Sequence, residues 1–132
     1  MRPACLIVDD NAQFLQASRL LLEREGLTVV DVVSTVDQCL RRTAELRPDI
    51  VLVDVELGEE SGFELAQRLA RGGAGRPGVI FISTHTEQDY ADLVGDSGAL
   101  GFLSKSQVSR EAIELLWRSR PPGWVTQDPA SA

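Results

Sequence analysis

The chain has 132 residues, a length that suits a single domain able to bury a core without disulfides or metal ions. Hydrophobic residues make up 43% and charged residues 25%, as in ordinary globular proteins. The formal net charge of −7 argues against direct binding to nucleic acid or a membrane surface, because both need a basic face. We expect a cytoplasmic protein without membrane insertion, because no hydrophobic run is long enough to cross a bilayer and the N-terminal run is too short for a signal peptide.

Two cysteines, Cys5 and Cys39, lie in hydrophobic segments without C-x-x-C spacing. This pattern predicts two reduced, buried thiols. A disulfide or a redox role is the alternative.

Five short hydrophobic runs, mostly rich in β-branched residues, alternate with amphipathic stretches along the chain. The runs predict β-strands at residues 4–8, 27–33, 49–54, 79–83 and 99–103. The stretches between them predict helices at residues 12–25, 35–46, 62–71, 86–95 and 108–118. Gly26 is a helix stop, and Ser34, Thr86 and Ser109 are candidate N-caps.

Strands that alternate with helices in this way predict an α/β fold, with a parallel sheet covered by helices on both faces. Connections between the strands are expected to be right-handed. We expect residues 1–120 to form one domain and residues 121–132, which begin with two prolines, to form a flexible C-terminal tail.

Polar side chains stand at the ends of four predicted strands. They are Asp9 and Asp10 after the first, Asp54 at the third, Ser83 and Thr84 at the fourth, and Ser104 and Lys105 after the fifth. Ligands of open parallel sheets bind at the carboxyl ends of the strands, so these groups should converge on one edge.

Such a cluster restricts the chemistry. Two carboxylates ~4 Å apart repel by about 4 kcal/mol at an effective dielectric near 20. Three acids therefore need a cation, and a hard ion such as Mg²⁺ is the natural ligand for oxygen donors. Lys105 is the single lysine among 13 basic residues, which suggests that its position is chosen for chemistry.

The segments "LIVDD", "PDIVLVDVELGEESGFEL", "VIFIST" and "GALGFLSK" together resemble the receiver domain of bacterial response regulators, the phosphorelay proteins of two-component systems. The resemblance covers about residues 4 to 118. It implies a flavodoxin-like, doubly wound fold with five parallel strands in the order 2-1-3-4-5 and five helices.

The resemblance also implies the roles of the acidic residues. Asp54 matches the aspartate that takes a phosphoryl group from a histidine kinase or a histidine phosphotransfer protein. Asp9 and Asp10 match the pair that holds Mg²⁺, together with Asp54 and the backbone carbonyl of Glu56. Lys105 matches the lysine that contacts a phosphoryl oxygen.

Other matched positions concern switching and lifetime. Ser83 matches the switch hydroxyl, with Thr84 beside it in the site, and Phe102 matches the aromatic that rearranges with it. Glu56 and His85 should flank the entrance for water and tune the lifetime of the phosphoryl group. Such a domain catalyses only its own phosphorylation and dephosphorylation, and is not otherwise an enzyme.

The resemblance implies an output surface made of the fourth helix, the fifth strand and the fifth helix. A downstream protein would bind there, with Trp117 as a candidate contact unless it packs inward. The resemblance also allows a homodimer. Because residues after 118 contain no recognisable output segment, we expect a stand-alone type.

Three positions depart from the family pattern. Ser106 follows Lys105 where the family usually has a proline, often with a cis bond. Gly58 replaces a proline in the loop after Asp54, so we expect that loop to be more mobile than usual. Thr84 stands where alanine is common and could narrow access to the site.

Simpler roles remain open for the same residues: a helix cap for Asp9 and Asp10, strand-end hydroxyls for Ser83 and Thr84, core packing for Phe102, a surface charge for Lys105, and an exposed loop position for His85. Other functions are also open to a chain with a strand-end aspartate. A phosphatase or phosphotransferase of the haloacid dehalogenase type wants a second aspartate where Glu56 stands, and a histidine phosphotransfer protein has a different fold. A receiver-like interaction module that is never phosphorylated is the main alternative.

Overall fold

The computed structural model describes residues 3–71, 76–84 and 97–120. The predicted helix at 86–95, its cap Thr86, the lifetime candidate His85 and the predicted tail at 121–132 lie outside the described residues. None of the helices in the described part of the chain is long and apolar enough to cross a membrane.

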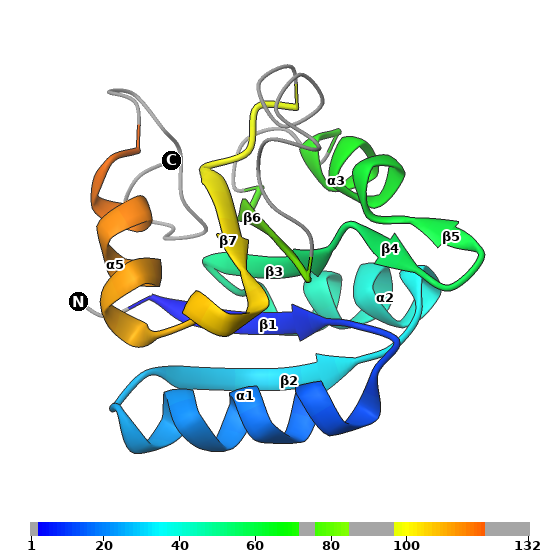
Figure 1. The fold of residues 1–132 in the computed structure, drawn as a ribbon. Helices are drawn as coiled ribbons and strands as arrows, with labels where there is room; N and C mark the ends of the chain where they lie inside the picture. The colour runs from blue at the N-terminus through cyan, green and yellow to red at the C-terminus, as the bar shows by residue number, and fades with distance from the viewer. Residues whose placement is uncertain (1–2, 72–75, 85–96, 121–132) are drawn as a thin grey trace.

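A five-stranded parallel sheet forms the centre of the domain (Figure 1). Its strands are β1 (Ala4–Val8), β2 (Thr28–Val33), β3 (Ile50–Asp54), β6 (Gly78–Ser83) and β7 (Gly101–Ser104). The order across the sheet is β2-β1-β3-β6-β7. The expected order 2-1-3-4-5 is confirmed, because β6 and β7 are the fourth and fifth of the predicted strands.

Four α-helices among the described residues cover the sheet. They are α1 (Ala12–Arg24), α2 (Val36–Leu46), α3 (Gly62–Ala70) and α5 (Arg110–Arg118). α1 and α5 pack on one face, and α2 and α3 pack on the other. Because helices cover both faces of this parallel sheet, its strands are mostly continuous hydrophobic runs in the sequence and not alternating ones.

The helix caps are close to those predicted, with two corrections. Ser109 caps α5 as expected, but Thr35 and not Ser34 caps α2, because its side chain accepts the N–H of Gln38. The N-cap of α1 is Asn11, so the helix-cap alternative for the acidic pair is wrong. The acidic pair is thereby left without a capping role.

The segment after Asp54 forms a small antiparallel hairpin that the sequence pattern did not predict. It consists of β4 (Glu56–Leu57) and β5 (Glu60–Ser61), joined through Gly58, whose φ of +65° lies in the left-handed region that favours glycine. The Glu60 carboxylate also accepts the backbone N–H of Val36 at the start of α2. These contacts give the loop defined partners, while its expected mobility stays a prediction.

Both cysteines are buried, free thiols, which confirms the reduced state expected for them. Cys5 packs in the core on the α1 and α5 face, whereas Cys39 packs in the core on the α2 and α3 face. Burial raises the pKa of Cys5 to about 12 and that of Cys39 to about 11. The thiolate needed for redox or nucleophilic chemistry is therefore strongly disfavoured in both.

Candidate functional site

Asp54 is the last residue of β3, and its side chain is held where the strand meets the loop. The residue is only 5% exposed, and its Oδ1 accepts the backbone N–H of Glu56 at 3.1 Å. Directly behind it lies Gly62, the first residue of α3. A side chain there would collide with the carbonyl oxygen of Asp54 and would meet the Cα of Val55 at 2.9 Å. Gly62 therefore lets α3 begin against the backbone of Asp54.

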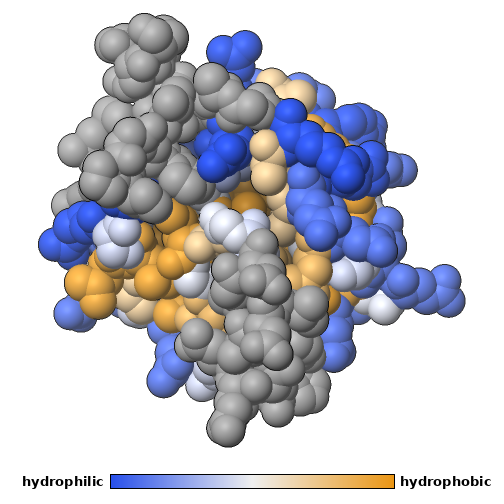
Figure 2. Space-filling model, turned by 90° about the horizontal axis from the view of Figure 1, so that it is seen from above, coloured by the Kyte–Doolittle hydropathy of each residue, from blue (hydrophilic) through white to orange (hydrophobic). Residues whose placement is uncertain are grey.

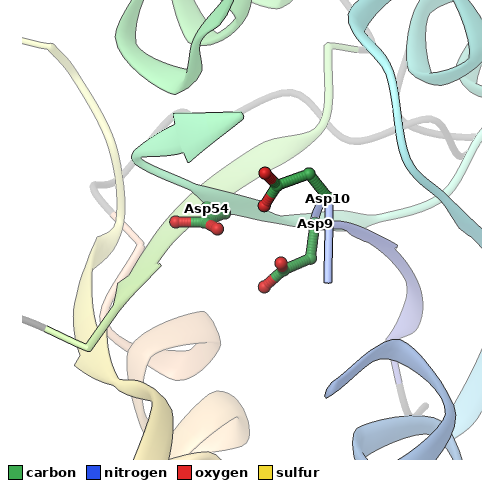
Figure 3. A group of neighbouring side chains, drawn as sticks. All are labelled: Asp9, Asp10 and Asp54. Atoms are coloured by element: carbon green, nitrogen blue, oxygen red, sulfur yellow. The ribbon is translucent and has the colours of Figure 1, made fainter. Parts of the chain in front are cut away.

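Two further carboxylates come from the end of β1. Figure 3 shows Asp9 and Asp10 beside Asp54, and oxygen atoms of the three side chains lie within 4.8 Å of one another. Asp9 is fully buried and its Oδ1 accepts the N–H of Asn11 at 2.8 Å, whereas Asp10 is exposed. The parallel register places the ends of β1 and β3 at the same edge of the sheet.

Lys105, the one lysine of the chain, brings its ammonium group into this cluster. Its Nζ lies 2.6 Å from Asp9 Oδ2 and 3.2 Å from Asp54 Oδ2, and its side chain is 14% exposed. The surface-charge alternative for Lys105 is therefore wrong. A short 3-10 helix, η2 (Lys105–Gln107), begins here, and the bond from Lys105 to Ser106 is trans.

The electrostatics follow from burial and from the excess of acids. Burial raises the pKa of Asp54 to about 6, the Glu56 N–H opposes this rise, the charge of Asp9 adds to it and Lys105 opposes it. Burial alone would lower the pKa of Lys105, but its hydrogen bond to Asp9 and the charge of Asp54 raise it overall. The lysine is thus kept as a cation, and negative charge remains in excess around it.

An open cavity of about 250 Å³ lies over these groups. Its lining consists of Asp10, Asn11, Asp54, Glu56, Gly58, Ser83, Thr84 and Lys105. Ser83, at the end of β6, is buried, and the neighbouring Thr84 is exposed. A cavity of this kind gives a small anionic group direct access to the Asp54 carboxylate.

The residues present fit a hard divalent cation. Asp9 Oδ2 is fully buried, and within the described ranges it has no hydrogen bond of good geometry, its short contact being the Lys105 ammonium. Carboxylate oxygens are the donors that Mg²⁺ prefers. Asp9, Asp10 and Asp54 are the side chains that would hold such an ion.

Phe102 and Trp117 pack against the cores on opposite faces of the sheet. Phe102, in β7, is half-buried and packs against the core on the α2 and α3 face. Trp117 packs against the core on the α1 and α5 face, with the Arg120 guanidinium 3.7 Å from its ring centroid. Trp117 is thus partly turned inward, and the switching role of Phe102 stays a prediction.

Sequence reasoning missed Asn11 and Gly62 as parts of the site. Asn11 directly follows the acidic pair, and the position after a strand-end acid and before a helical stretch is a sequence signal for a cap. Gly62 follows Ser61, whose side chain caps α3. A glycine at the start of a predicted helix, in the segment that follows Asp54, could have indicated a close backbone approach.

The match to known families agrees with this geometry. Residues 5–116 match the family model of the response regulator receiver domain. The chain belongs to this family. The receiver resembles the response regulator GacA of Pseudomonas aeruginosa, at 29% identity over 84% of the chain and 52% of the relative. It also resembles the DNA-binding transcriptional activator EvgA of Escherichia coli, at 26% identity over 84% of the chain and 54% of the relative.

A solved structure gives a further comparison. The signal receiver domain of a modulated diguanylate cyclase from Desulfovibrio desulfuricans is 30% identical, with a TM-score of 0.75 over 91% of this chain and 94% of that one. The chain spans about half the length of the curated relatives it matches. These relatives include DNA-binding regulators, so the comparisons do not bear out the stand-alone type expected above.

Proposed function

We propose that this receiver domain accepts a phosphoryl group on Asp54 from a histidine kinase or a histidine phosphotransfer protein, in a reaction that depends on Mg²⁺. The observation that carries the proposal is the position of the Asp54 carboxylate in an open cavity, 3.2 Å from Lys105 and grouped with two further carboxylates. Such a group has a nucleophile, a fixed cation and donors for a metal in one place.

In the proposed reaction, an oxygen of Asp54 attacks the phosphorus of a phosphohistidine. A bond forms between oxygen and phosphorus, the phosphorus–nitrogen bond breaks, and its electron pair stays on the imidazole nitrogen. Lys105 stabilises negative charge on the transferring group, and the Glu56 N–H orients the Asp54 carboxylate. Mg²⁺, held by Asp9, Asp10 and Asp54 with the Glu56 carbonyl, would neutralise charge on the phosphoryl oxygens.

The phosphoryl group would change a protein-binding surface. Its added charge of about −1.5 to −2 attracts the Ser83 hydroxyl, and Phe102 would repack into the space released. Figure 2 shows hydrophobic residues gathered on the part of the surface where α5 and β7 lie in Figure 1, and Leu115 of α5 is 62% exposed. A downstream protein or a second copy of the chain would bind this face.

Hydrolysis of the aspartyl phosphate would end the signal. Glu56 is exposed and lines the cavity, so its side chain can reach water that enters toward Asp54. We expect Glu56→Ala and His85→Ala each to change the rate of hydrolysis at least severalfold while Asp54 stays phosphorylatable. Equal lifetimes of both variants and the wild type would assign these side chains no part in the process.

The test is phosphorylation by acetyl phosphate with and without Mg²⁺, read by intact-protein mass spectrometry. Wild-type protein should gain one phosphoryl group only when Mg²⁺ is present during the reaction, Asp54→Asn should gain none, and Asp31→Asn should behave like the wild type. Circular dichroism checks that each variant is folded. A folded wild type that stays unmodified would favour the interaction module that is never phosphorylated.

A further inference from the structure

The Lys105 ammonium has a third neighbour besides its two carboxylates. Its Nζ lies over the ring of Phe14, 4.7 Å from the ring centroid. This distance is within the range of a cation–π interaction, in which the negative face of the ring attracts the cation. Because the lysine side chain is only 14% exposed, the contact is partly shielded from water and is stronger than at an open surface.

The position of the Phe14 ring is set by the first turn of α1. The backbone N–H of Phe14 donates to Asn11 Oδ1 at 3.1 Å, and its carbonyl accepts the hydroxyl of the buried Ser18 at 2.7 Å. The ring itself is half-buried and packs against the core shared by α1 and α5. Both the backbone and the side chain of Phe14 are therefore held before any ligand arrives.

A lysine carries its compact charge on a flexible stem of four carbons, so neighbouring groups must restrict its conformation if the charge is to keep one position. In this structure the ammonium lies closer to Asp9 (2.6 Å) than to Asp54 (3.2 Å). To contact a phosphoryl group on Asp54 it must exchange a carboxylate oxygen for a phosphoryl oxygen. The face of an aromatic ring attracts the ammonium but does not compete with the phosphoryl oxygen for its hydrogen bonds. The ring can therefore keep the ammonium in place during this exchange.

We propose that Phe14 is a positioning residue that holds the Lys105 ammonium over the site while the lysine passes from the carboxylates to the phosphoryl group. This inference rests on the proposed function of Asp54. It differs from a core-packing role for Phe14, because it requires the ring face and is not satisfied by an aliphatic side chain of similar size.

Three variants separate the two roles. Phe14→Leu keeps a hydrophobic side chain but removes the ring, and Phe14→Tyr keeps the ring. Phe63→Leu is the matched control, because Phe63 is also half-buried and packs in a core, against Phe81 at 4.7 Å between ring centroids. Thermal unfolding of each variant measures the general cost of losing the packing.

The first readout is the NMR spectrum of metal-free protein labelled with ¹³C,¹⁵N-lysine. Lys105 is the single lysine, so one spin system reports on it without assignment. Protons on its Cε should be shifted upfield by the ring in the wild type, Phe14→Tyr and Phe63→Leu, and should move downfield in Phe14→Leu. An unchanged shift in Phe14→Leu would overturn the contact.

The second readout is the affinity for beryllofluoride, a phosphoryl mimic, at saturating Mg²⁺. Phe14→Leu should bind about 3- to 30-fold more weakly, the range that corresponds to a partly desolvated cation–π contact. Phe14→Tyr keeps the ring face, so it should bind beryllofluoride within about twofold of the wild type, a smaller loss than that expected for Phe14→Leu. Equal affinity of Phe14→Leu and wild type, equal losses in Phe14→Leu and Phe63→Leu, or no recovery in Phe14→Tyr would each overturn the positioning role.

Failure of the proposed function gives a different result. Wild-type protein would then show no beryllofluoride binding, which overturns both the function of Asp54 and the positioning of Lys105 toward a phosphoryl group. The lysine proton shifts would still separate this case from a wrong contact, because they are measured without metal or beryllofluoride.

Discussion

The acidic site at the carboxyl edge and a second cavity between β2 and α2 both contain acidic and basic side chains. The second cavity has a volume of about 360 Å³, larger than the 250 Å³ of the first. It is lined by Asp31, Val32, Val33, Gln38, Arg41, Arg42 and Glu45. Size and the presence of charges therefore do not distinguish the two places.

Burial and the balance of charge do distinguish them. Around the second cavity, Arg42 lies 2.7 Å from both Asp31 and Glu45, and the three side chains are 38%, 26% and 57% exposed. Two acids there face two arginines. At the first site, three acids face one lysine, and Asp9 and Asp54 are almost completely buried. An unbalanced, buried cluster costs stability unless it binds something, which is why the smaller cavity carries the function we propose.

The largest effect we expect concerns the backbone that supports the buried site. Gly62→Ala should lower the free energy of unfolding by about 3 kcal/mol or more, because its new methyl group must displace backbone and not a flexible side chain. Urea unfolding measures the change. Gly98→Ala is the control: its new methyl group meets no atom within 4 Å, so only the strain of its φ of +75° lowers stability, by about 1 to 2 kcal/mol. Equal costs in the two variants would contradict the close packing behind Asp54.

The next prediction tests whether the buried acid destabilises the metal-free protein. Asp54→Asn should raise the free energy of unfolding at pH 7.5 by about 1 to 3 kcal/mol, because the pKa of Asp54 is raised from 3.8 to about 6 and each pKa unit corresponds to about 1.4 kcal/mol. Asp31→Asn should instead lower the free energy of unfolding by up to about 1 kcal/mol, since it weakens a partly exposed ion pair.

The sign of the pH dependence follows from the direction of the Asp54 shift. Its pKa in the folded protein, about 6, is above the ordinary value of 3.8, so the folded state binds the proton more tightly. The contribution of this group to stability is fully present below about pH 3.8 and is lost as pH rises through 6. The advantage of Asp54→Asn should therefore be largest above pH 6.5 and should shrink toward pH 4, with unfolding measured at each pH. A pH-independent difference would contradict the raised pKa.

A metal titration sharpens the same comparison. Mg²⁺ at about ten times its dissociation constant should stabilise the wild type by about 1.4 kcal/mol, as for any ligand that binds only the folded state. Asp10→Asn should reduce this effect, and because Asp10 is exposed the variant should fold normally. Asp31→Asn should keep it in full. Thermal unfolding with and without Mg²⁺ measures the stabilisation. Equal stabilisation of all three proteins would argue against the three carboxylates as the metal site.

The smallest effect belongs to the partly exposed cluster of Arg42, Asp31 and Glu45. Arg42→Gln should lower the free energy of unfolding by less than about 1 kcal/mol, and 0.5 M NaCl should remove most of that difference, because exposed ion pairs are weak and screened by salt. Arg42→Gln should leave the phosphorylation of Asp54 unchanged. Loss of phosphorylation in this variant would show that the second cavity is not separate from the first.

Much of the fold could be predicted because periodicity and turn residues act locally. The hydrophobic runs placed the five sheet strands within about two residues of their observed bounds, and Gly26 ends the first helical segment with a positive φ of 93°. The hairpin of β4 and β5 escaped prediction because its strands of two residues are too short to show a period. The shift of the α2 cap from Ser34 to Thr35 shows the usual uncertainty where two capping residues are adjacent.

The sequence by itself determined which chemical groups stand at the strand ends: the acids Asp9, Asp10 and Asp54, and the single lysine, Lys105. Parallel strands then bring their carboxyl ends together, so the convergence of these groups follows from the chain order alone. Only the tertiary structure decided how the charges are shared, because this depends on side-chain distances and burial across segments far apart in the chain. It placed the Lys105 ammonium nearest to Asp9, set the Phe14 ring beneath it, and packed Gly62 against the backbone of Asp54, and none of these contacts has a period or a spacing that a sequence can display.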